Sequence, residues 1–397
     1  MAALKKILVL DTGKEWGGGT NSLLELVRRC DKERYAFTAL FYNNYAKGST
    51  SDIKTELGGL GIDCHIIGQT PQGRAAKALK ETVRAFFFLA PGLKKKYLFY
   101  LDFKRRIMPN AGRIAAFIKD GGYDLLYMNN QPSSNLEGII AAHSVGVPSL
   151  QHARIEAALN EIEAKAVNTL VSKVICVSNR VRDGLIASGV APDKCVVIHN
   201  GIDAALKAKR DPQTIRDELE IPSGSLVVGA VGSLVKRKRA GLLIEAMTMI
   251  DNAVCVIVGD GPERPGLRAL AQRLGIDGRV RFTGFSQDAL SYINAMDIFV
   301  LPSEKEGFPR VILEAMLMGR PVVAFDVAGA GEEIVDNKTG IIMKSSGPQA
   351  IADAILNISS NGKDRIEAMG AAGRDRVITE FDIKRYVSGV CEVFDKV

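Results

Sequence analysis

The chain has 397 residues, 47% hydrophobic and 24% charged, with no low-complexity tract, which argues against a fibrous or disordered protein. Its length favours two or three domains over a single core. The net charge of +7 suits an anionic partner, such as a phosphate, a nucleic acid or an acidic membrane face, without choosing among them.

The cysteines and the N-terminal run bear on location. The six cysteines have neither metal nor redox spacing and several lie in apolar runs, so we expect free thiols in a reducing compartment. The run "MAALKKILVLDTG" lacks the length and the cleavage site of a signal peptide. No stretch approaches the roughly eighteen apolar residues of a membrane span. A cytoplasmic location is therefore expected.

Short β-branched runs alternate with helical patterns through both halves of the chain. The first half contains "KILVLD", "FTALFY", "DLLYMN" and "KVICVS", and the second contains "LVVGAVG", "AVCVIVGDG", "DIFVLPS" and "PVVAFD". This alternation is typical of parallel βαβ units. We therefore predict an α/β protein with two Rossmann-like, doubly wound parallel-sheet domains.

The boundary between the domains is predicted just after "HNGID", residues 199–203, where a strand ends in an Asn-Gly turn and a charged segment follows. The predicted domains are 1–203 and 204–378. The closing segment 379–397 has apolar residues at helical spacing, and we expect this helix to pack back on the N-terminal domain.

Three consecutive glycines, Gly17, Gly18 and Gly19, separate the first predicted strand from the first helix. Glycines at this position allow a ligand to approach the backbone and leave helix amides free. The segment is neither G-x-G-x-x-G nor a P-loop, which argues against a dinucleotide oxidoreductase.

Residues 73–107 concentrate basic and aromatic side chains and depart from the βα alternation. One interpretation is a basic amphipathic surface that contacts an anionic bilayer. The other is a pair of core helices with buried aromatic and solvated charged residues. The apolar residues of the segment include Phe86, Phe87, Phe88, Leu89, Tyr97, Phe99 and Tyr100.

His152 stands at the end of a predicted strand in "LQHARIEA". A single histidine is most often a buried, hydrogen-bonded structural residue. The carboxyl end of a parallel strand, however, is where such folds bind ligands, which favours a ligand contact for His152.

A basic loop follows the strand "VVGAVG" and precedes a helix. It contains Lys236, Arg237, Lys238 and Arg239. Clustered cations at the carboxyl end of a parallel strand could neutralise a diphosphate leaving group. The alternative is a solvated basic loop without function.

The segment "SEKEGFPRVILEAMLMGRPVVAF" carries Glu306 and Glu314 on either side of Pro309. If residues 306–314 were all helical, the two Cα atoms would lie roughly 12 Å apart along the axis. That separation exceeds the distance between paired glycosidase carboxylates. A helix that begins at Pro309 would leave the amides of Arg310, Val311 and Ile312 unpaired, and these would form an anion site.

The segment "EGFPRVILEAM…GRPVVAFDVAGAGEEIVDNKTG" resembles the E-x7-E region of retaining glycosyltransferases with the two-domain B-type fold (GT-B), specifically the family-four group also called glycosyl transferases group 1. "ICVSNRVRDGLIASGVAPDKCVVIHNGID", "VGSLVKRKR" and "VIVGDGPER" are similar to further segments of that pattern. The resemblance implies two Rossmann-like domains facing across a cleft, with the nucleotide-sugar donor mostly on the C-terminal one.

The resemblance also implies roles for individual residues. Glu306 would contact the hydroxyls of the donor sugar, Glu314 would hold the ribose, and Lys238 would bind the diphosphate. His152 would lie near C6 of the sugar. The other implied donor contacts are Gly18, Gly19, Gly307, Phe308, Pro309, Val311 and Ile312. Many members carry arginine where this chain has Ser233, and Arg237 could supply that missing cation.

The resemblance implies transfer of a sugar from a nucleoside diphosphate to an acceptor hydroxyl with retained configuration, with Glu306, Lys238 and His152 as catalytic residues. No cofactor and no metal are expected, since no Asp-x-Asp pair occurs in the chain. The expected acceptor is a lipid-linked or envelope glycan at the inner face of a membrane, and no nucleic-acid partner is expected. The alternatives are a sugar-nucleotide epimerase on the same fold and a catalytically silent sugar-nucleotide binding protein.

Overall fold

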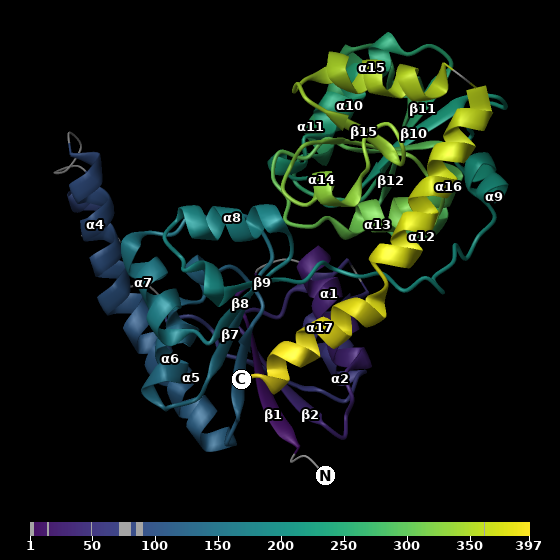
Figure 1. The fold of residues 1–397 in the computed structure, drawn as a ribbon. Helices are drawn as coiled ribbons and strands as arrows, with labels where there is room; N and C mark the ends of the chain where they lie inside the picture. The colour runs from purple at the N-terminus through teal and green to yellow at the C-terminus, as the bar shows by residue number, and fades with distance from the viewer. Residues whose placement is uncertain (1–3, 14–15, 49, 71–80, 85–89, 361) are drawn as a thin grey trace.

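The computed structural model describes residues 4–13, 16–48, 50–70, 81–84, 90–360 and 362–397. Within these residues two α/β domains follow one another along the chain (Figure 1). Each has its own parallel sheet, as the alternation of strand and helix patterns predicted. Phe86, Phe87, Phe88 and Leu89 of the basic aromatic segment lie outside the described residues.

The N-terminal sheet has seven parallel strands in the order β5-β2-β1-β6-β7-β8-β9. Its first strand is buried along most of its length because apolar residues form an almost continuous run there, as both faces of a parallel sheet are covered. The strands are β1 (Lys5–Asp11), β2 (Tyr35–Phe41), β5 (Asp63–Ile66), β6 (Leu125–Met128), β7 (Ser149–Ala153), β8 (Lys173–Cys176) and β9 (Cys195–Val197). A two-stranded antiparallel hairpin consists of β3 (Ala46–Lys47) and β4 (Ser51–Asp52).

The C-terminal sheet has six parallel strands in the order β12-β11-β10-β13-β14-β15. All six residues of its strand β11 are buried, which explains the uninterrupted apolar run "AVCVIV". The strands are β10 (Leu226–Val231), β11 (Ala253–Val258), β12 (Val280–Gly284), β13 (Ile298–Leu301), β14 (Val322–Phe325) and β15 (Gly340–Met343).

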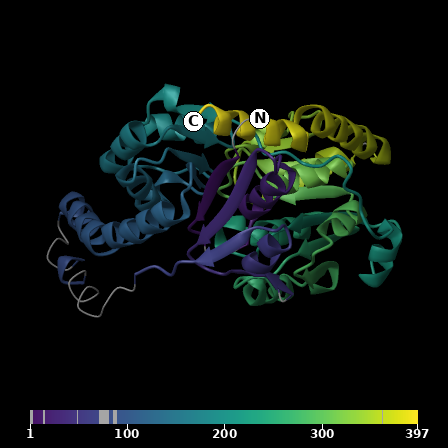
Figure 2. The same cartoon turned by 90° about the horizontal axis from the view of Figure 1, so that it is seen from below.

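Helices cover the sheets and connect their strands (Figures 1 and 2). Those of the N-terminal domain are α1 (Gly18–Arg29), α2 (Ile53–Gly58), α4 (Pro91–Asp102), α5 (Met108–Gly121), α6 (Leu136–Ser144), α7 (Glu161–Leu170) and α8 (Asn179–Ala187). Those that follow are α9 (Pro212–Glu218), α10 (Ala240–Ala246), α11 (Arg264–Arg273), α12 (Ala289–Ala295), α13 (Arg310–Leu317), α14 (Ala330–Glu333), α15 (Pro348–Ser359), α16 (Gly362–Glu380) and α17 (Ile383–Asp395).

The chain passes between the domains twice, and the two passages run side by side. The Ile202 amide donates to the Phe381 carbonyl at 2.9 Å, and the Ile383 amide donates to the Ile202 carbonyl at 3.0 Å. Gly201 permits this close approach, because a Cβ there would lie 2.7 Å from the Cα of Ile383. The predicted boundary residues, 203 and 378, lie next to these passages.

The last helix, α17, lies against the N-terminal domain, whereas α16 belongs to the C-terminal one (Figures 1 and 2). Phe394 of α17 packs edge-on against Tyr127 of β6, with ring centroids 5.3 Å apart. Tyr35 of β2 donates a hydrogen bond to Asp395 at 2.6 Å. This packing explains the helical spacing of the closing segment, whose apolar side faces the first domain.

The strand order identifies one point in each sheet where successive connections run in opposite directions. This topological switch point lies between β1 and β6 in the N-terminal sheet, and between β10 and β13 in the C-terminal sheet. Open parallel sheets bind ligands outside the carboxyl ends of the strands at such points.

Candidate functional site

The loops after β10 and β13 meet at the switch point of the C-terminal sheet. The Glu304 amide donates to the Arg237 carbonyl at 2.8 Å and so joins loop 302–309 to loop 232–239. Arg239 also forms an ion pair with Glu304 at 2.9 Å. Two segments about seventy residues apart in the chain are thereby held as one unit.

Lys238 and Glu306 form the centre of this unit. The Lys238 ammonium donates to Oε1 of Glu306 at 2.6 Å, and the Arg237 guanidinium lies 4.0 Å from Oε2. Glu306 is only 8% exposed, so its carboxylate lies against these cations rather than in solvent. The Lys238 side chain also passes beside Gly232, where a Cβ would lie 3.9 Å from the ammonium nitrogen. The structure thus brings the predicted Glu306, Lys238 and Arg237 together.

Ser233 lies between Gly232 and the basic loop. Its carbonyl accepts the Val235 amide at 3.0 Å, which closes a tight turn at the end of β10. Ser233 is partly exposed on the same loop as Arg237, the residue that could supply the cation missing at position 233.

The beginning of α13 differs from the sequence prediction. Pro309 has an extended backbone and precedes the helix, which begins at Arg310. The Ile312 amide donates to the Pro309 carbonyl at 2.9 Å, so the prediction of an unpaired Ile312 amide was wrong. Among the described residues, the Arg310 and Val311 amides have no such acceptor. The anion site at this helix end is therefore reduced to two amides, with the positive end of the helix dipole behind them.

Because α13 begins at Arg310, residues 306–314 do not form one continuous helix. Glu314 lies about one turn after Arg310 in α13. Its carboxylate is 3.9 Å from Nε of Arg310, and its side chain is 20% exposed. Burial raises the pKa of Glu314, and the charge of Arg310 opposes that rise. Arg310 itself donates to the Gly201 carbonyl at 3.3 Å, which connects α13 to the first interdomain passage.

Gly307 and Phe308 lie at the contact between the two domains. A Cβ at Gly307 would overlap the carbonyl oxygen of Arg154 from the N-terminal domain. The Phe308 ring stacks on His199 at 4.8 Å and meets Phe381 edge-on at 5.4 Å. Phe308 is only 4% exposed, so its ring packs at the domain contact, and its predicted place beside the sugar stays a prediction.

The glycine segment differs from the predicted loop. Gly17 precedes α1, and Gly18 and Gly19 are its first two residues. Gly18 is exposed, and a Cβ there would meet no atom within 4 Å. A Cβ at Gly19 would lie 3.5 Å from the Arg154 side chain. The glycines thus form the amino end of α1, near the switch point of the N-terminal sheet.

His152 lies within β7 and its side chain is fully buried. Its Nδ1 is hydrogen-bonded to the Tyr127 hydroxyl at 2.5 Å, while Nε2 has no partner among the described residues. Burial, reinforced by the charge of Arg154, holds the pKa of His152 well below its usual value, so the ring is neutral. The strand places the ring between Tyr127 and Tyr386, and the role of His152 near the sugar stays a prediction.

Arg154, two residues further on, was not predicted. Its guanidinium donates to Asn129 at 2.8 Å, to Asn200 at 3.0 Å and to the Tyr386 hydroxyl at 3.1 Å. Asp11 lies next to this group and accepts from the Gly13 amide at 2.6 Å and from Asn129 at 2.7 Å. Burial raises the pKa of Asp11, although these hydrogen bonds and Arg154 oppose the rise. No local motif marks Arg154, since its partners are distant in sequence.

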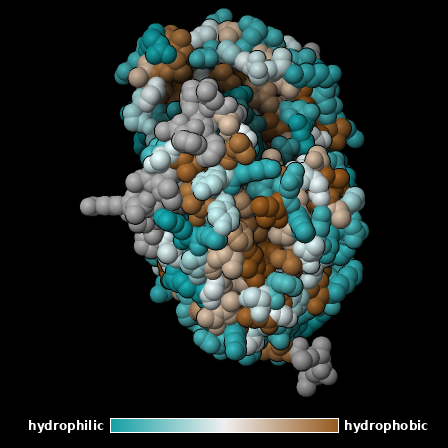
Figure 3. Space-filling view, turned by 90° about the vertical axis from the view of Figure 1, so that its left-hand side faces the viewer, coloured by the Kyte–Doolittle hydropathy of each residue, from teal (hydrophilic) through white to brown (hydrophobic). Residues whose placement is uncertain are grey.

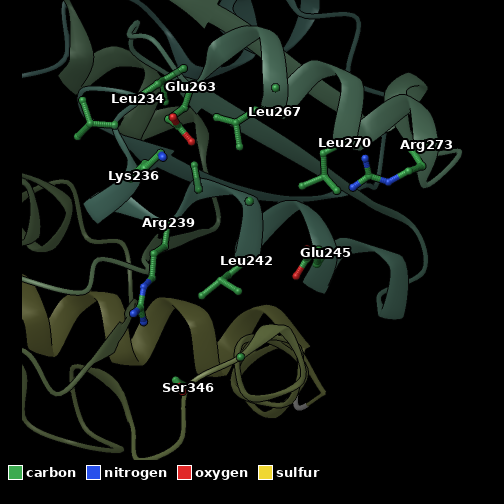
Figure 4. Close-up of a pocket in the computed structure, with 15 residues that line it drawn as sticks. Leu234, Lys236, Arg239, Leu242, Glu245, Glu263, Leu267, Leu270, Arg273 and Ser346 are labelled. Carbon is green, nitrogen blue, oxygen red and sulfur yellow. The ribbon is translucent and has the colours of Figure 1, made fainter.

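A groove of about 570 Å³ lies beside the basic loop, on the side where α10 and α11 approach the segment before α15 (Figure 4). It is lined by Leu234, Leu242, Leu267 and Leu270, with Lys236 and Arg239 at one end. None of the donor contacts implied by the family resemblance lines it. Within the described part of the chain, no cluster of histidine, cysteine or acidic residues has the arrangement of a metal site.

Two family models match successive parts of the chain. Residues 49–206 match the model described as Glycosyltransferase Family 4, and residues 211–376 match the model described as Glycosyl transferases group 1. The division between the two matches falls at the first interdomain passage. Together they cover most of both domains and all the predicted site residues except Gly18 and Gly19.

Curated relatives come from several organisms. The chain is 30% identical over 190 residues to the lipopolysaccharide core biosynthesis glycosyltransferase LpsD of Rhizobium meliloti, covering 48% of this chain and 55% of the relative. It is 25% identical over 340 residues to an Escherichia coli UDP-Gal:alpha-D-GlcNAc-diphosphoundecaprenol alpha-1,3-galactosyltransferase, covering 80% and 84%. For LpsD and several other relatives, the match spans about half the length of the relative.

Solved structures share the fold over nearly the whole chain. Anabaena Alr3699/HepE in complex with UDP superposes with a TM-score of 0.78 at 23% identity, covering 99% of this chain and all of that one. The sucrose-phosphate synthase of Thermosynechococcus elongatus superposes with a TM-score of 0.74 at 20% identity, covering 99% and 98%. These likenesses confirm the predicted two-domain α/β architecture.

Proposed function

The chain belongs to glycosyltransferase family 4, with the GT-B fold, and from this premise we propose that it transfers a sugar from a nucleoside diphosphate to an acceptor hydroxyl with retained anomeric configuration. The observation that supports this proposal most directly is the Lys238–Glu306 pair beside the amino end of α13. It combines a cation and a carboxylate within one hydrogen bond, at the place where the sheet topology expects a ligand.

The pair can serve both parts of a nucleotide sugar. The departing diphosphate gains negative charge during transfer, and Lys238, Arg237 and the Val311 amide are the groups available to stabilise that charge. The Glu306 carboxylate can accept hydrogen bonds from sugar hydroxyls once the diphosphate competes for Lys238. Glu314, one turn along α13, is the proposed ribose contact. In this proposal Lys238 and Glu306 are catalytic residues because both touch the donor.

Donor binding is tested by thermal stabilisation with a panel of UDP-, GDP- and ADP-sugars. A donor at 100 times its dissociation constant stabilises the folded protein by about 2.7 kcal/mol, which a melting curve detects. We expect Lys238→Met to abolish the stabilisation by the preferred donor, and Lys363→Met, at an exposed position on α16, to keep it. Equal stabilisation of wild type and Lys238→Met would refute the site.

Transfer itself is tested with the preferred donor and a simple glycoside acceptor. Removal of an electrostatic contact to the leaving group costs about 100- to 1,000-fold in kcat, so we expect a loss of that order for Lys238→Met and for Glu306→Gln. Proton NMR of the first product gives its anomeric configuration. A product of inverted configuration would refute the retaining mechanism, and donor binding without transfer to any acceptor would favour a silent binding protein.

We also propose that the acceptor is a lipid-linked or envelope glycan and that α4 contacts the membrane surface. The printed names of the Rhizobium and Escherichia relatives refer to lipopolysaccharide core and to an undecaprenyl diphosphate acceptor. Helix α4 lies at the left edge of the molecule in Figure 1, and Figure 3, which shows that side of the molecule, has apolar patches among polar residues. Leu93, Tyr97 and Tyr100 are about half or more exposed beside Lys95 and Lys96. Among the described residues no helix is long and apolar enough to cross a bilayer.

Co-sedimentation with vesicles tests this surface. We expect binding to phosphatidylcholine vesicles that contain phosphatidylglycerol, and none to phosphatidylcholine alone, because anionic lipid attracts nearby lysines. Leu93→Ser combined with Tyr100→Ser should abolish binding and leave the melting temperature unchanged. The matched control is Leu274→Ser, which replaces an exposed apolar residue just after α11. Equal binding of all variants would refute the role of α4.

A further inference from the structure

Arg154 joins the two domains at the position where their carboxyl-end loops touch. Its guanidinium makes four hydrogen bonds, to Asn129, Asn200, Tyr386 and, at 3.4 Å, the Tyr127 hydroxyl. The partners come from three segments: β6 and the residue just after it, the first interdomain passage, and α17. A planar guanidinium holds several acceptors in one fixed geometry, which a lysine ammonium cannot reproduce.

The contacts of Arg154 continue to the loop that carries Glu306. Asn200, which is 4% exposed, accepts from Arg154 with Oδ1 and donates with Nδ2 to the Phe308 carbonyl at 2.9 Å. The Arg154 carbonyl lies directly against Gly307, where no side chain would fit. Loop 302–309 of the C-terminal domain is therefore held from the N-terminal domain through one side chain and one backbone contact.

The same arginine supports the amino end of α1. The Arg154 side chain lies under Gly19, 3.5 Å from the position of a Cβ. Its partner Asn129 donates to Asp11, whose carboxylate in turn accepts the Gly13 amide. The segment before α1 and loop 302–309 thus share Arg154 as a common support, although they belong to different domains.

We propose that Arg154 is a positioning residue for transfer, acting through Asn200 and Gly307 on the loop of Glu306 and through Gly19 on the amino end of α1. This inference rests on the proposed function, since it assigns Arg154 the task of setting the donor loop against the acceptor-side domain. The donor groups themselves, Lys238, Glu306 and Glu314, all lie in the C-terminal domain. A loss of Arg154 should therefore change the reaction geometry much more than donor affinity.

Steady-state kinetics with the preferred donor separate these two effects. A misplacement of about 1 Å can cost roughly 100-fold in rate, so we expect Arg154→Met to lower kcat between about 10- and 100-fold while the donor KM stays within about threefold. Arg154→Lys should recover only part of kcat. Arg182→Met, whose charge pairs on the surface with Asp183, should match wild type. An Arg154→Met variant that changes only the donor KM, or that keeps wild-type kcat, would overturn the proposal.

Asn200→Asp isolates the step through Phe308, because it keeps an acceptor for Arg154 and removes the donor to the Phe308 carbonyl. We expect its kcat to fall as that of Arg154→Met does, together with a lower melting temperature because the Phe308 carbonyl loses its donor. A normal kcat for Asn200→Asp would overturn the path through Asn200.

Hydrogen–deuterium exchange without donor tests the same inference independently of activity. Arg154→Met should raise deuterium uptake in peptides covering 303–313 and 16–22, but not in those covering β10 and β11. Unchanged uptake in 303–313 overturns the positioning role even if the protein is an active transferase. Raised uptake supports that role even if no donor is found and the proposed function fails.

Discussion

Glu332 of the C-terminal domain accepts a hydrogen bond from His199 Nε2 at 2.9 Å, across the first interdomain passage. The same carboxylate accepts the backbone amides of Asn179 at 3.0 Å and Arg180 at 3.2 Å. These are the first two residues of α8, so a side chain of one domain satisfies the helix end of the other. His199 also stacks on Phe308, which places this contact next to the loop of Glu306.

The first prediction concerns acid stability. Burial of Glu332 would raise its pKa, but the hydrogen bonds from His199, Asn179 and Arg180 outweigh burial and lower the pKa to about 2. A carboxyl with a lowered folded pKa stabilises the protein above its unfolded pKa, near 4.5, and loses this contribution as the pH falls toward 2. At neutral pH the contribution is at most about 3 kcal/mol.

Urea unfolding at a series of pH values measures this contribution. We expect Glu332→Gln to be less stable than wild type at neutral pH, with a difference that shrinks between about pH 4.5 and pH 2. Glu392→Gln, at an exposed position on α17, should differ little from wild type throughout. A difference between Glu332→Gln and wild type that does not depend on pH would contradict the prediction.

The second prediction concerns Gly307. In Gly307→Ala the new methyl group would overlap the Arg154 carbonyl. The atoms that it would meet belong to the backbone of Arg154 and Ile155, which cannot turn aside as a side chain can, so the loop must move. We expect a melting temperature several degrees lower, consistent with a loss of about 1 to 3 kcal/mol, together with reduced transfer. Gly266→Ala, in α11 with open space around it, is the matched control and should be neutral or slightly stabilising. Gly307→Ala with wild-type stability would show that the domains do not touch there in solution.

The third prediction concerns the hydrogen bonds of Tyr386 that connect α17 to the first domain. The Tyr386 hydroxyl accepts from Arg154 at 3.1 Å and donates to the Ser22 carbonyl at 3.2 Å, and the side chain is 2% exposed. Tyr386→Phe removes both hydrogen bonds at nearly constant volume, so we expect a loss of about 1 to 3 kcal/mol in chemical unfolding. Tyr100→Phe, at a position on α4 that is about half exposed, serves as the control. Equal stabilities of Tyr386→Phe and wild type would contradict this connection.

The fourth prediction tests where α17 lies. The sulfur atoms of Cys30, after α1, and Cys391, in α17, are 3.3 Å apart, although 361 positions separate them in sequence. Oxidation with diamide should join them in a disulfide, with both thiol hydrogens passing to diamide to give its hydrazine. Peptide mapping should recover the Cys30–Cys391 cross-link in wild type and not in Cys391→Ser. Recovery of other pairs alone would show that α17 packs elsewhere.

Much of the fold was predictable because periodicity along the chain is a local signal. The buried runs of β1 and β11 indicated parallel strands, and the spacing of Tyr386, Val390 and Phe394 indicated a closing helix with one apolar side. The pairing of Lys238 with Glu306 was also within reach, since both follow strands that were recognisable in the sequence. What local signals missed was the exact start of a helix: Pro309 precedes α13, and one of the three expected amides is already bonded.

The sequence by itself determined the class of fold, the switch-point loops and the cations of the C-terminal domain, because strand and helix patterns and short motifs depend on neighbouring residues. Only the tertiary structure decided that His152 is sealed among aromatic rings while Arg154 joins the domains. Their environments are made by Tyr127, Asn200 and Tyr386, which folding brings together from distant positions. No pattern in the sequence around His152 and Arg154 indicates which of the two side chains is buried among aromatic rings and which connects the domains.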